Sequence, residues 1–255
     1  MTQALPTNRF KRSLAAFTPQ IGFWLNFASA TVTEVCAHAG FDWLLIDMEH
    51  SPNDLPEVVD HLRALEGGTA EPIVRVPWNE PVMVKRLMDQ GARSFLFPFV
   101  QSAEEARRAV AATRYPPRGI RGFAGTTRAN RYARVPDYAK KAEDDVCVLV
   151  QAETMTAVGQ IEEIAKVEGV DGIFIGPADL AASMGHIGNT QHPEVQAAIF
   201  DAGARIKRAG KAPGFLSLRE DETRRVLAGG FVFVAVGTDV ALFARQVDAL
   251  AQKYR

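Results

Sequence analysis

The sequence predicts an α/β fold, and within that class a (β/α)8 TIM barrel that forms one domain over residues 1–255. Three observations lead to this prediction. Short apolar runs alternate with longer segments of helical periodicity from residue 20 to the end of the chain. The runs number eight and are almost continuously apolar, which is typical of parallel strands covered on both faces. The length of 255 residues is also usual for such a barrel, and a doubly wound open sheet is the alternative.

Eight strands are expected, and helices follow them along the chain. The strands cover residues 21–27, 43–49, 72–77, 94–100, 146–153, 170–177, 211–216 and 231–237. Between them, Ser102 and Glu105 have the spacing of a capping box, and Asn53 precedes another helical segment. In the last segment, apolar residues recur every three or four positions. They form one apolar stripe made of Val240, Phe243, Val247, Leu250 and Tyr254.

The balance of charges excludes several classes of partner. Lys and Arg number 29 against 30 Asp and Glu, a formal net charge of -1, so no global positive field draws nucleic acid or an anionic membrane. No run reaches the roughly 20 apolar residues of a membrane span, and no signal-peptide core follows the basic N-terminal residues. Cys36 and Cys147 lie far apart in apolar stretches, as buried thiols do. We therefore expect a cytoplasmic protein.

The longest irregular stretch covers residues 115–145 and is rich in Pro, Gly and Arg. A loop of this length within a compact domain usually serves function or assembly, so we interpret it as a lid or a subunit-contact loop. Its arginines could instead form a nucleic-acid patch, but the neutral chain and the scarcity of interleaved aromatic residues favour the first interpretation. The arginines concerned are Arg114, directly before this stretch, and Arg118, Arg121, Arg128, Arg131 and Arg134 within it.

Polar side chains gather where the expected strands end, which is the catalytic end of such a barrel. They are Asp47, Glu49, His50, Arg75, Gln151, Glu153 and Asp179. Glu153 and Asp179 follow neighbouring strands, and two carboxylates with few other ligands suit a hard divalent cation such as Mg2+ or Mn2+. Two solvated acids, or one acid paired with Arg75, are the alternative. The turn that begins at Gly176 favours the metal, because the helix after it could hold an anionic carboxylate at its N-terminus.

His50 and Arg75 are the candidate groups for proton transfer and anion binding. His50 follows an apolar strand and would be within reach of a molecule bound at the mouth. Arg75 lies in an apolar strand, where a guanidinium must meet an anion: a substrate carboxylate or enolate, or else Asp47 or Glu49 in a structural pair. The lysines lie on expected helices or loops or at the wrong end of a strand, which disfavours a Schiff-base mechanism. No P-loop, G-x-G-x-x-G or G-x-S-x-G motif is present.

Six longer segments make the sequence resemble a known family. They are LLIDMEHSPND (44–54), VRVPW (74–78), LMDQGA (87–92), VQAET (150–154), EGVDGIFIGPADLAASMG (168–185) and HPEVQAAI (192–199), and together they span nearly the whole chain. The family is that of the HpcH/HpaI aldolases, which are metal-dependent class II pyruvate aldolases, and the chain is similar in particular to its 4-hydroxy-2-oxoheptanedioate aldolase branch. The resemblance implies a barrel of the phosphoenolpyruvate/pyruvate type and a divalent metal cofactor, Mg2+, Mn2+ or Co2+.

The resemblance also implies a role for each matching residue. The chemical positions are Glu153 and Asp179 as metal ligands, Gln151 beside the metal, Arg75 at the oxygen that becomes an enolate, and His50 as the proton-transfer group held by Asp47 and by Asp89 of a neighbouring subunit. The substrate-binding positions are Gly176, Pro177 and Ala178 at the ketoacid carboxylate, and Trp24 and Leu216 beside the aldehyde. One departure from the family pattern is RGFAG at residues 121–125, in the long loop.

The sequence thus predicts an enzyme that reversibly cleaves a 4-hydroxy-2-oxoacid into an aldehyde and pyruvate, or a related ketoacid such as hydroxypyruvate. A CoA-thioester lyase of the malyl-CoA or citramalyl-CoA type would need a nucleotide site, which the sequence does not reveal. A non-catalytic ketoacid-binding protein would need no proton-transfer group such as His50. The resemblance also implies a homo-oligomer, a hexamer built as a trimer of dimers, with small molecules rather than nucleic acid or membrane as its other partners.

Overall fold

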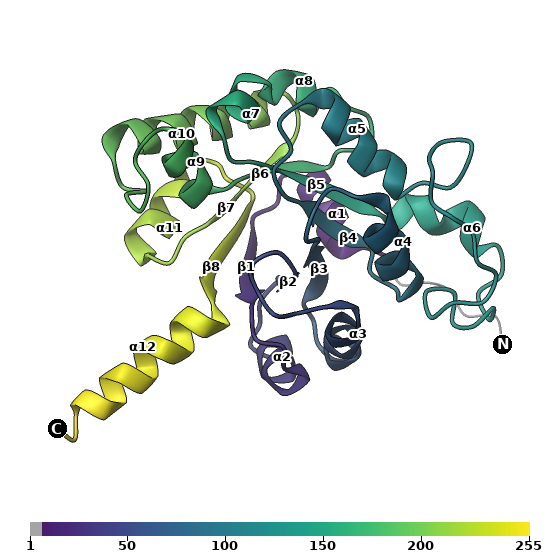
Figure 1. Cartoon of the computed structure of the whole chain (residues 1–255), viewed down its shortest axis with the longest axis horizontal. Helices are drawn as coiled ribbons and strands as arrows, with labels where there is room; N and C mark the ends of the chain where they lie inside the picture. Colours follow the sequence, from purple (N-terminus) through teal and green to yellow (C-terminus); the bar gives the residue numbers. More distant parts are fainter. Residues whose placement is uncertain (1–6) are drawn as a thin grey trace.

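The chain forms a closed barrel of eight parallel strands with helices around it (Figure 1). This computed structural model describes residues 7–255. Each strand pairs with the next in the sequence, and β1 pairs with β8 to close the barrel. The predicted (β/α)8 barrel is confirmed. The open doubly wound sheet is wrong, because it would leave two strands with unpaired edges.

The strands follow the predicted apolar runs. They are β1 Gln20–Leu25, β2 Trp43–Asp47, β3 Glu71–Arg75, β4 Ser94–Phe97, β5 Cys147–Ala152, β6 Gly172–Ile175, β7 Ala212–Leu216 and β8 Phe233–Thr238. Most of them end slightly earlier than the apolar runs suggest. Glu49 and Glu153 therefore lie in the loops directly after β2 and β5. Side chains in these loops need not alternate between the two faces of the sheet, as they do within a strand.

Helices connect the strands on the outside of the barrel. They are α1 Arg9–Ala15, α2 Ala30–Ala37, α3 Leu55–Ala64, α4 Pro81–Asp89, α5 Ala103–Ala112, α6 Tyr138–Lys141, α7 Met155–Gly159, α8 Ile161–Ala165, α9 Pro177–Ser183, α10 Pro193–Arg208, α11 Glu220–Ala228 and α12 Asp239–Gln252, with the short 3-10 helices η1 Leu65–Gly67 and η2 Ala142–Asp145. No helix among residues 7–255 is long and apolar enough to cross a bilayer.

Two apolar clusters divide the buried side chains between the two faces of the strands. On β2, Leu44 and Ile46 belong to the cluster under the helices, whereas Trp43 and Leu45 belong to the cluster inside the barrel. This alternation explains the continuous apolar runs in the sequence, since neither face of a strand meets water. Gly22 admits the Trp43 ring, because a Cβ at residue 22 would lie 2.1 Å from its atoms.

Helix α1 closes the N-terminal end of the barrel. The Phe10 ring packs against Trp43 and Phe233, with centroid distances of 6.0 and 5.8 Å, and Phe10 is fully buried. Its neighbour Leu14 joins the same internal cluster. Apolar side chains thus fill the interior at the N-terminal end of the barrel. The catalytic residues of such barrels lie at the C-terminal ends of the strands.

The helix starts agree in part with the capping signals. The Ser102 hydroxyl accepts from the N–H of Glu105 at 3.2 Å, but the Glu105 carboxylate reaches the N–H of Gln101 and not that of Ser102. Asp54 caps α3 with a complete capping box. The Asn53 side chain instead donates to the carbonyl of Asp47 at 2.8 Å, which ties this loop to the end of β2.

Helix α12 projects away from the barrel (Figure 1). Its predicted apolar stripe exists, but from Val240 to Tyr254 the five side chains are between 42 and 86% exposed. Phe243 keeps one contact with the barrel, an edge-to-face contact with Phe27 at 5.9 Å. Within one chain the stripe therefore covers very little of the core.

Candidate active site

Asp47 is the centre of the hydrogen-bond network at the mouth of the barrel. The carboxylate is fully buried and accepts from Arg75 Nε at 2.8 Å and Nη2 at 2.7 Å. It also accepts from Trp24 Nε1 at 3.3 Å and Asn26 Nδ2 at 2.9 Å. Burial acts to raise the pKa of Asp47, but the hydrogen bonds and charge of Arg75 outweigh burial, so the pKa is lowered. Asp47 therefore stays ionised and fixes the side chains around it.

Arg75 lies beside Asp47 in register, on the neighbouring strand β3. Its Nη1 is also 2.8 Å from Glu49 Oε2, and its guanidinium lies over the Trp24 ring at 5.0 Å. Burial alone would lower the pKa of Arg75, but the two carboxylates raise it. A guanidinium has five N–H donors, and the two hydrogen bonds to Asp47 use one on Nε and one on Nη2. The expected pair with Asp47 and Glu49 exists, with Glu49 held as an ion pair at Nη1, and N–H groups on both terminal nitrogens are left for a bound molecule.

His50 stands at the rim, where its side chain is 66% exposed. Its backbone N–H is 3.4 Å from Asp47 Oδ1, and its imidazole Nε2 is 4.0 Å from Glu49 Oε2. Within one chain Asp47 thus holds this residue through the backbone, and Glu49 is the carboxylate beside the ring. The imidazole is left accessible to a substrate at the mouth.

Glu153 lies one residue beyond β5 and is 3% exposed. Its Oε1 accepts from the N–H of Phe99 at 2.7 Å, and its Oε2 accepts from the Gln151 amide. Burial raises the pKa of Glu153 to about 7, and the charges of Glu49 and Asp179 act in the same direction. Gly176 permits this arrangement, because a Cβ there would lie 2.5 Å from Glu153 Oε2.

The residues present fit a divalent cation. The charges of Asp47, Glu49 and Glu153 act on the Arg75 guanidinium, and the charges of Glu49, Glu153 and Asp179 act on one another. Gln151 Oε1 is buried and has no hydrogen-bond partner among the described residues. Crowded carboxylates and an unpartnered amide oxygen are the hard ligands that Mg2+ and Mn2+ prefer.

The remaining predicted residues surround this centre on two sides. Gly176 caps α9 without a side chain, and Pro177, Ala178 and Asp179 form the first turn of that helix. Asp179 is exposed at the surface of the mouth. On the other side, Leu216 ends β7 and is half-buried.

Asp89 lies elsewhere. It ends α4, which begins after β3 at the mouth and runs toward the other end of the barrel. Its Oδ1 accepts from Arg121 Nη2 at 3.0 Å, and Arg121 is buried against the Tyr115 ring at 4.4 Å. The buried Arg121 Nε and Nη1 have no hydrogen-bond partner among the described residues. Within one chain the structure therefore brings Asp89 to Arg121, in the long loop, and not to His50.

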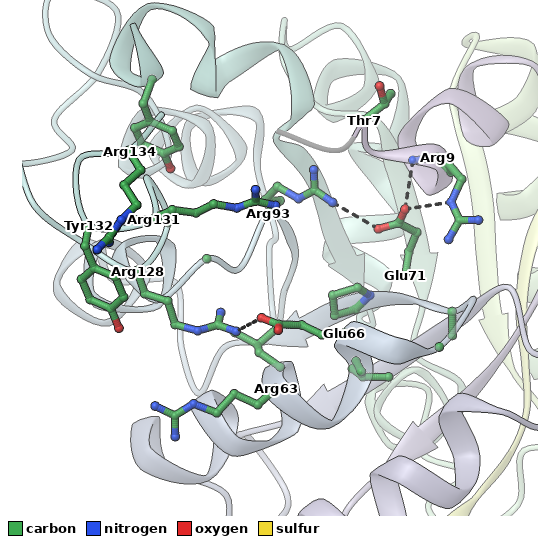
Figure 2. Close-up of a pocket in the computed structure, with 18 residues that line it drawn as sticks. Thr7, Arg9, Arg63, Glu66, Glu71, Arg93, Arg128, Arg131, Tyr132 and Arg134 are labelled. Atoms are coloured by element: carbon green, nitrogen blue, oxygen red, sulfur yellow. Dashed lines mark hydrogen bonds and ion pairs between the residues drawn. The ribbon is translucent and has the colours of Figure 1, made fainter. Parts of the chain in front are cut away.

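A separate cavity of about 910 Å³ lies at the N-terminal end of β3. Its lining includes none of the residues predicted for the active site. Figure 2 shows its charged side chains: Arg9, Arg63, Arg93, Arg128, Arg131 and Arg134, with Glu66 and Glu71. Glu71 is shared by Arg9 at 3.3 Å and Arg93 at 3.4 Å. This cavity is therefore distinct from the predicted active site.

Comparisons with known proteins show the family of the chain. The family model described as HpcH/HpaI aldolase/citrate lyase matches residues 20–246. The chain belongs to this family. A 4-hydroxy-2-oxo-heptane-1,7-dioate aldolase of Klebsiella pneumoniae is 55% identical over 97% of this chain and 94% of that protein, and one of Escherichia coli is 53% identical over 97% and 95%. A crystal structure of a family member from Burkholderia cenocepacia J2315 is 41% identical, with a TM-score of 0.94 over 98% of this chain and 100% of that one.

Two functional candidates were missed when the sequence was interpreted. Glu49 is considered in the sequence only as a possible structural partner of Arg75, although in the structure it also lies beside the His50 ring. Its position two residues after Asp47 was the available signal. Phe99 donates to Glu153 through its backbone N–H. A pattern of side chains in a sequence does not predict such a backbone donor.

Proposed function

We propose that this chain is a divalent-metal-dependent aldolase that reversibly cleaves 4-hydroxy-2-oxoacids into a 2-ketoacid and an aldehyde. The observation that carries the proposal is Arg75, paired with Asp47 and Glu49 at the mouth, together with the buried Glu153, whose pKa burial raises to about 7. The names of the relatives indicate 4-hydroxy-2-oxoheptanedioate as a substrate. Cleavage of that compound between C3 and C4 gives pyruvate and a four-carbon aldehyde acid.

Glu153 and Asp179 would hold the metal, with Gln151 beside it. When bound, a divalent cation supplies Lewis-acid polarisation of the ketoacid oxygens. Mg2+, Mn2+ and Co2+ are all suited to such a site. Gly176, Pro177 and Ala178 would face the ketoacid carboxylate, and since Gly176 has no side chain, none competes for the first-turn N–H groups of α9.

Arg75 would stabilise the negative charge that develops on the ketoacid carbonyl oxygen. Its remaining N–H groups belong to a guanidinium already fixed by hydrogen bonds to Asp47 and by an ion pair with Glu49, so the donors need no reorganisation when charge develops. Asp47 acts as a positioning residue in this scheme. Its carboxylate is satisfied by Arg75, Trp24 and Asn26 and has no access to the substrate.

His50 would transfer the proton of the C4 hydroxyl. In cleavage, the imidazole takes that proton directly or through a water, the C3–C4 bond breaks, and its electron pair remains on C3 as the pyruvate enolate. C4 becomes the aldehyde carbon, and C3 then takes up a proton to give pyruvate. In synthesis the imidazolium returns its proton to the aldehyde oxygen. Related donors such as hydroxypyruvate fit the same sequence of steps.

We further propose that the active enzyme is a homo-oligomer, a hexamer built as a trimer of dimers, in which Asp89 serves the His50 of a neighbouring subunit. The exposed stripe of α12 and the position of Asp89 far from its own mouth support this assembly. Mixing inactive His50→Ala with weakened Asp89→Asn protein tests it. Shared sites give hybrids with both residues intact and more activity than either parent, whereas sites within one chain give no gain although mass shows exchange.

Proton exchange at the methyl group of pyruvate is the decisive experiment for the function. With Mn2+ present, the enzyme should exchange these protons with solvent D2O, and a chelator should stop the exchange. A non-catalytic ketoacid-binding protein gives no exchange. Full activity in EDTA, or inactivation by borohydride plus pyruvate, would show imine chemistry and contradict the proposal. Activity toward CoA thioesters but not free 4-hydroxy-2-oxoacids would favour a CoA-thioester lyase.

A further inference from the structure

Two aromatic side chains form an exposed platform at the rim of the mouth. Trp78 lies in the loop between β3 and α4, and Phe99 lies in the loop between β4 and α5. Their ring centroids are 5.8 Å apart and their planes differ by 27°, which is a stacked pair. Trp78 is 54% and Phe99 38% exposed. Such rings are usually covered, and exposed ones beside a reactive centre commonly mark a recognition surface.

The platform is joined directly to the reactive centre. The N–H of Phe99 donates to Glu153 Oε1 at 2.7 Å, so the residue that carries one ring also holds the proposed metal ligand. Trp78 follows Arg75 by three residues, in the loop after the strand that supplies the guanidinium. Both rings therefore belong to loops that begin beside the reactive centre.

The backbone of Phe99 is strained. Its φ is +53°, in the left-handed region that a bulky residue seldom adopts and that costs about 1 kcal/mol or more. Glycine would supply the same N–H to Glu153 without that strain. The strained phenylalanine thus adds something that hydrogen bonding to Glu153 does not require.

Trp24 and Leu216, the residues expected to border the aldehyde, offer less surface. Trp24 is 2% exposed and lies beneath the Arg75 guanidinium, and Leu216 is half-buried against the internal cluster. An extended aldehyde tail that leaves the centre meets more apolar surface on Trp78 and Phe99 than on Trp24.

We propose that the Trp78–Phe99 platform is an acceptor subsite that binds aldehydes carrying a flat apolar group, such as aryl aldehydes. The inference rests on the proposed aldolase function and assigns the substrate class of its acceptor. The aldehyde carbon is placed at the centre, and the flat group stacks on the open face of Trp78. Stacked aromatic pairs contribute about 0.5–1.5 kcal/mol beyond the burial of apolar area.

The first test is the ratio of kcat/KM for benzaldehyde to kcat/KM for acetaldehyde, with pyruvate as the donor. Trp78→Ala and Phe99→Gly should each lower this ratio by about tenfold, or about 1.4 kcal/mol. Trp78→Phe keeps a flat ring and should retain most of the ratio. Met155→Ala is the matched control, because Met155 is 45% exposed two residues after Glu153 and lies outside the platform.

Several results would overturn the subsite. They are an unchanged ratio in both Trp78→Ala and Phe99→Gly, and an equal fall of the ratio in Met155→Ala. Trp78→Ala could also lower the sedimenting mass without changing the ratio, which would assign the platform to contact between copies of the chain. The ratio is taken between two substrates of the same variant. A general loss of activity lowers both kcat/KM values equally and therefore leaves the ratio unchanged.

The second test measures binding without turnover. Saturation-transfer NMR should detect the ring protons of benzyl alcohol on the wild-type enzyme, and Trp78→Ala should lose most of that signal. No signal on the wild type, or an equal signal on Trp78→Ala, contradicts the subsite. If the wild type neither exchanges pyruvate protons nor joins any aldehyde to pyruvate, the proposed function has failed, and the NMR comparison still decides whether the platform binds aryl groups.

Discussion

The two ends of the barrel hold opposite charges in different ways. At the mouth, Asp47 and Glu49 pair with the guanidinium of Arg75, and the charges of Glu49, Glu153 and Asp179 act on one another. At the N-terminal end, six arginines line a cavity with two glutamates, and Glu71 is shared between Arg9 and Arg93 (Figure 2). The arginines outnumber the glutamates there, but most of them are exposed to solvent, whereas Asp47 and Glu153 at the mouth are buried. Excess buried charge is unfavourable by itself, so the mouth is arranged for a ligand and the N-terminal end for structure.

The sharpest test of this comparison removes one carboxylate from the mouth. Glu153→Gln or Asp179→Asn should lower aldol cleavage by roughly 10³-fold or more, because the cation loses a ligand. Neither change should lower the thermal midpoint in EDTA, since each relieves repulsion among crowded carboxylates. Steady-state kinetics and thermal unfolding measure the two effects. A variant that is inactive because it is unfolded would contradict the comparison.

Substitution of His50 distinguishes proton transfer from stabilisation of the enolate charge at the mouth. His50→Ala should lower cleavage by about 10³-fold, because general acid-base catalysis contributes about 10²–10⁴-fold. Oxaloacetate decarboxylation passes through the same pyruvate enolate without a C4 hydroxyl, so it should fall by less than about tenfold. Parallel assays of the two reactions measure the difference. Equal losses would assign His50 to enolate formation.

Arg75 pairs with both Asp47 and Glu49 at the mouth, so its geometry should matter as well as its charge. Arg75→Lys should lower both cleavage and oxaloacetate decarboxylation by about 10²-fold, because an ammonium cannot contact Asp47 with two donors and the enolate oxygen at once. Near-normal rates in both assays would show that Arg75 has only the structural role of pairing with Asp47 and Glu49.

The raised pKa of Glu153 predicts a pH dependence of metal affinity. Since burial raises this pKa to about 7, protons compete with the cation below that pH. The Kd for Mn2+ should fall about tenfold per pH unit between pH 5.5 and 7 and then level off. The free energy of unfolding of the metal-free protein should decrease over the same range, because the folded state binds the proton more tightly than the unfolded state. Titrations followed by the Mn2+ electron-paramagnetic signal measure the first effect, and a flat Kd would contradict it.

The smallest expected effect is at the N-terminal end. Glu71→Gln leaves Arg9 and Arg93 without their shared carboxylate and should lower the free energy of unfolding by about 1–3 kcal/mol. kcat/KM should stay within about twofold, because Glu71 lies at the start of β3, the strand that carries Arg75 at its other end. Glu66→Gln is the control: this side chain is 70% exposed, and its pair with Arg128 should contribute little. Urea unfolding of both variants measures the difference.

The barrel was predictable because each strand is buried on both faces, which leaves an apolar run in the sequence. The charged residues of the mouth were predictable because they interrupt or follow those runs. The network that joins them was not, because the contact of Arg75 with Asp47 depends on the register of β2 and β3. The stripe of α12 was visible, but periodicity does not reveal whether a stripe packs on its own barrel.

The hydrogen bond between Phe99 and Glu153 has a consequence for substitution at position 99. It is donated by a backbone N–H, so any residue that tolerates the left-handed backbone at position 99, such as glycine or asparagine, can preserve it. The side chain at that position can therefore change while the Glu153 carboxylate keeps its donor. Single substitutions at residue 99 should thus alter the exposed surface of the mouth without removing the hydrogen bond that holds Glu153.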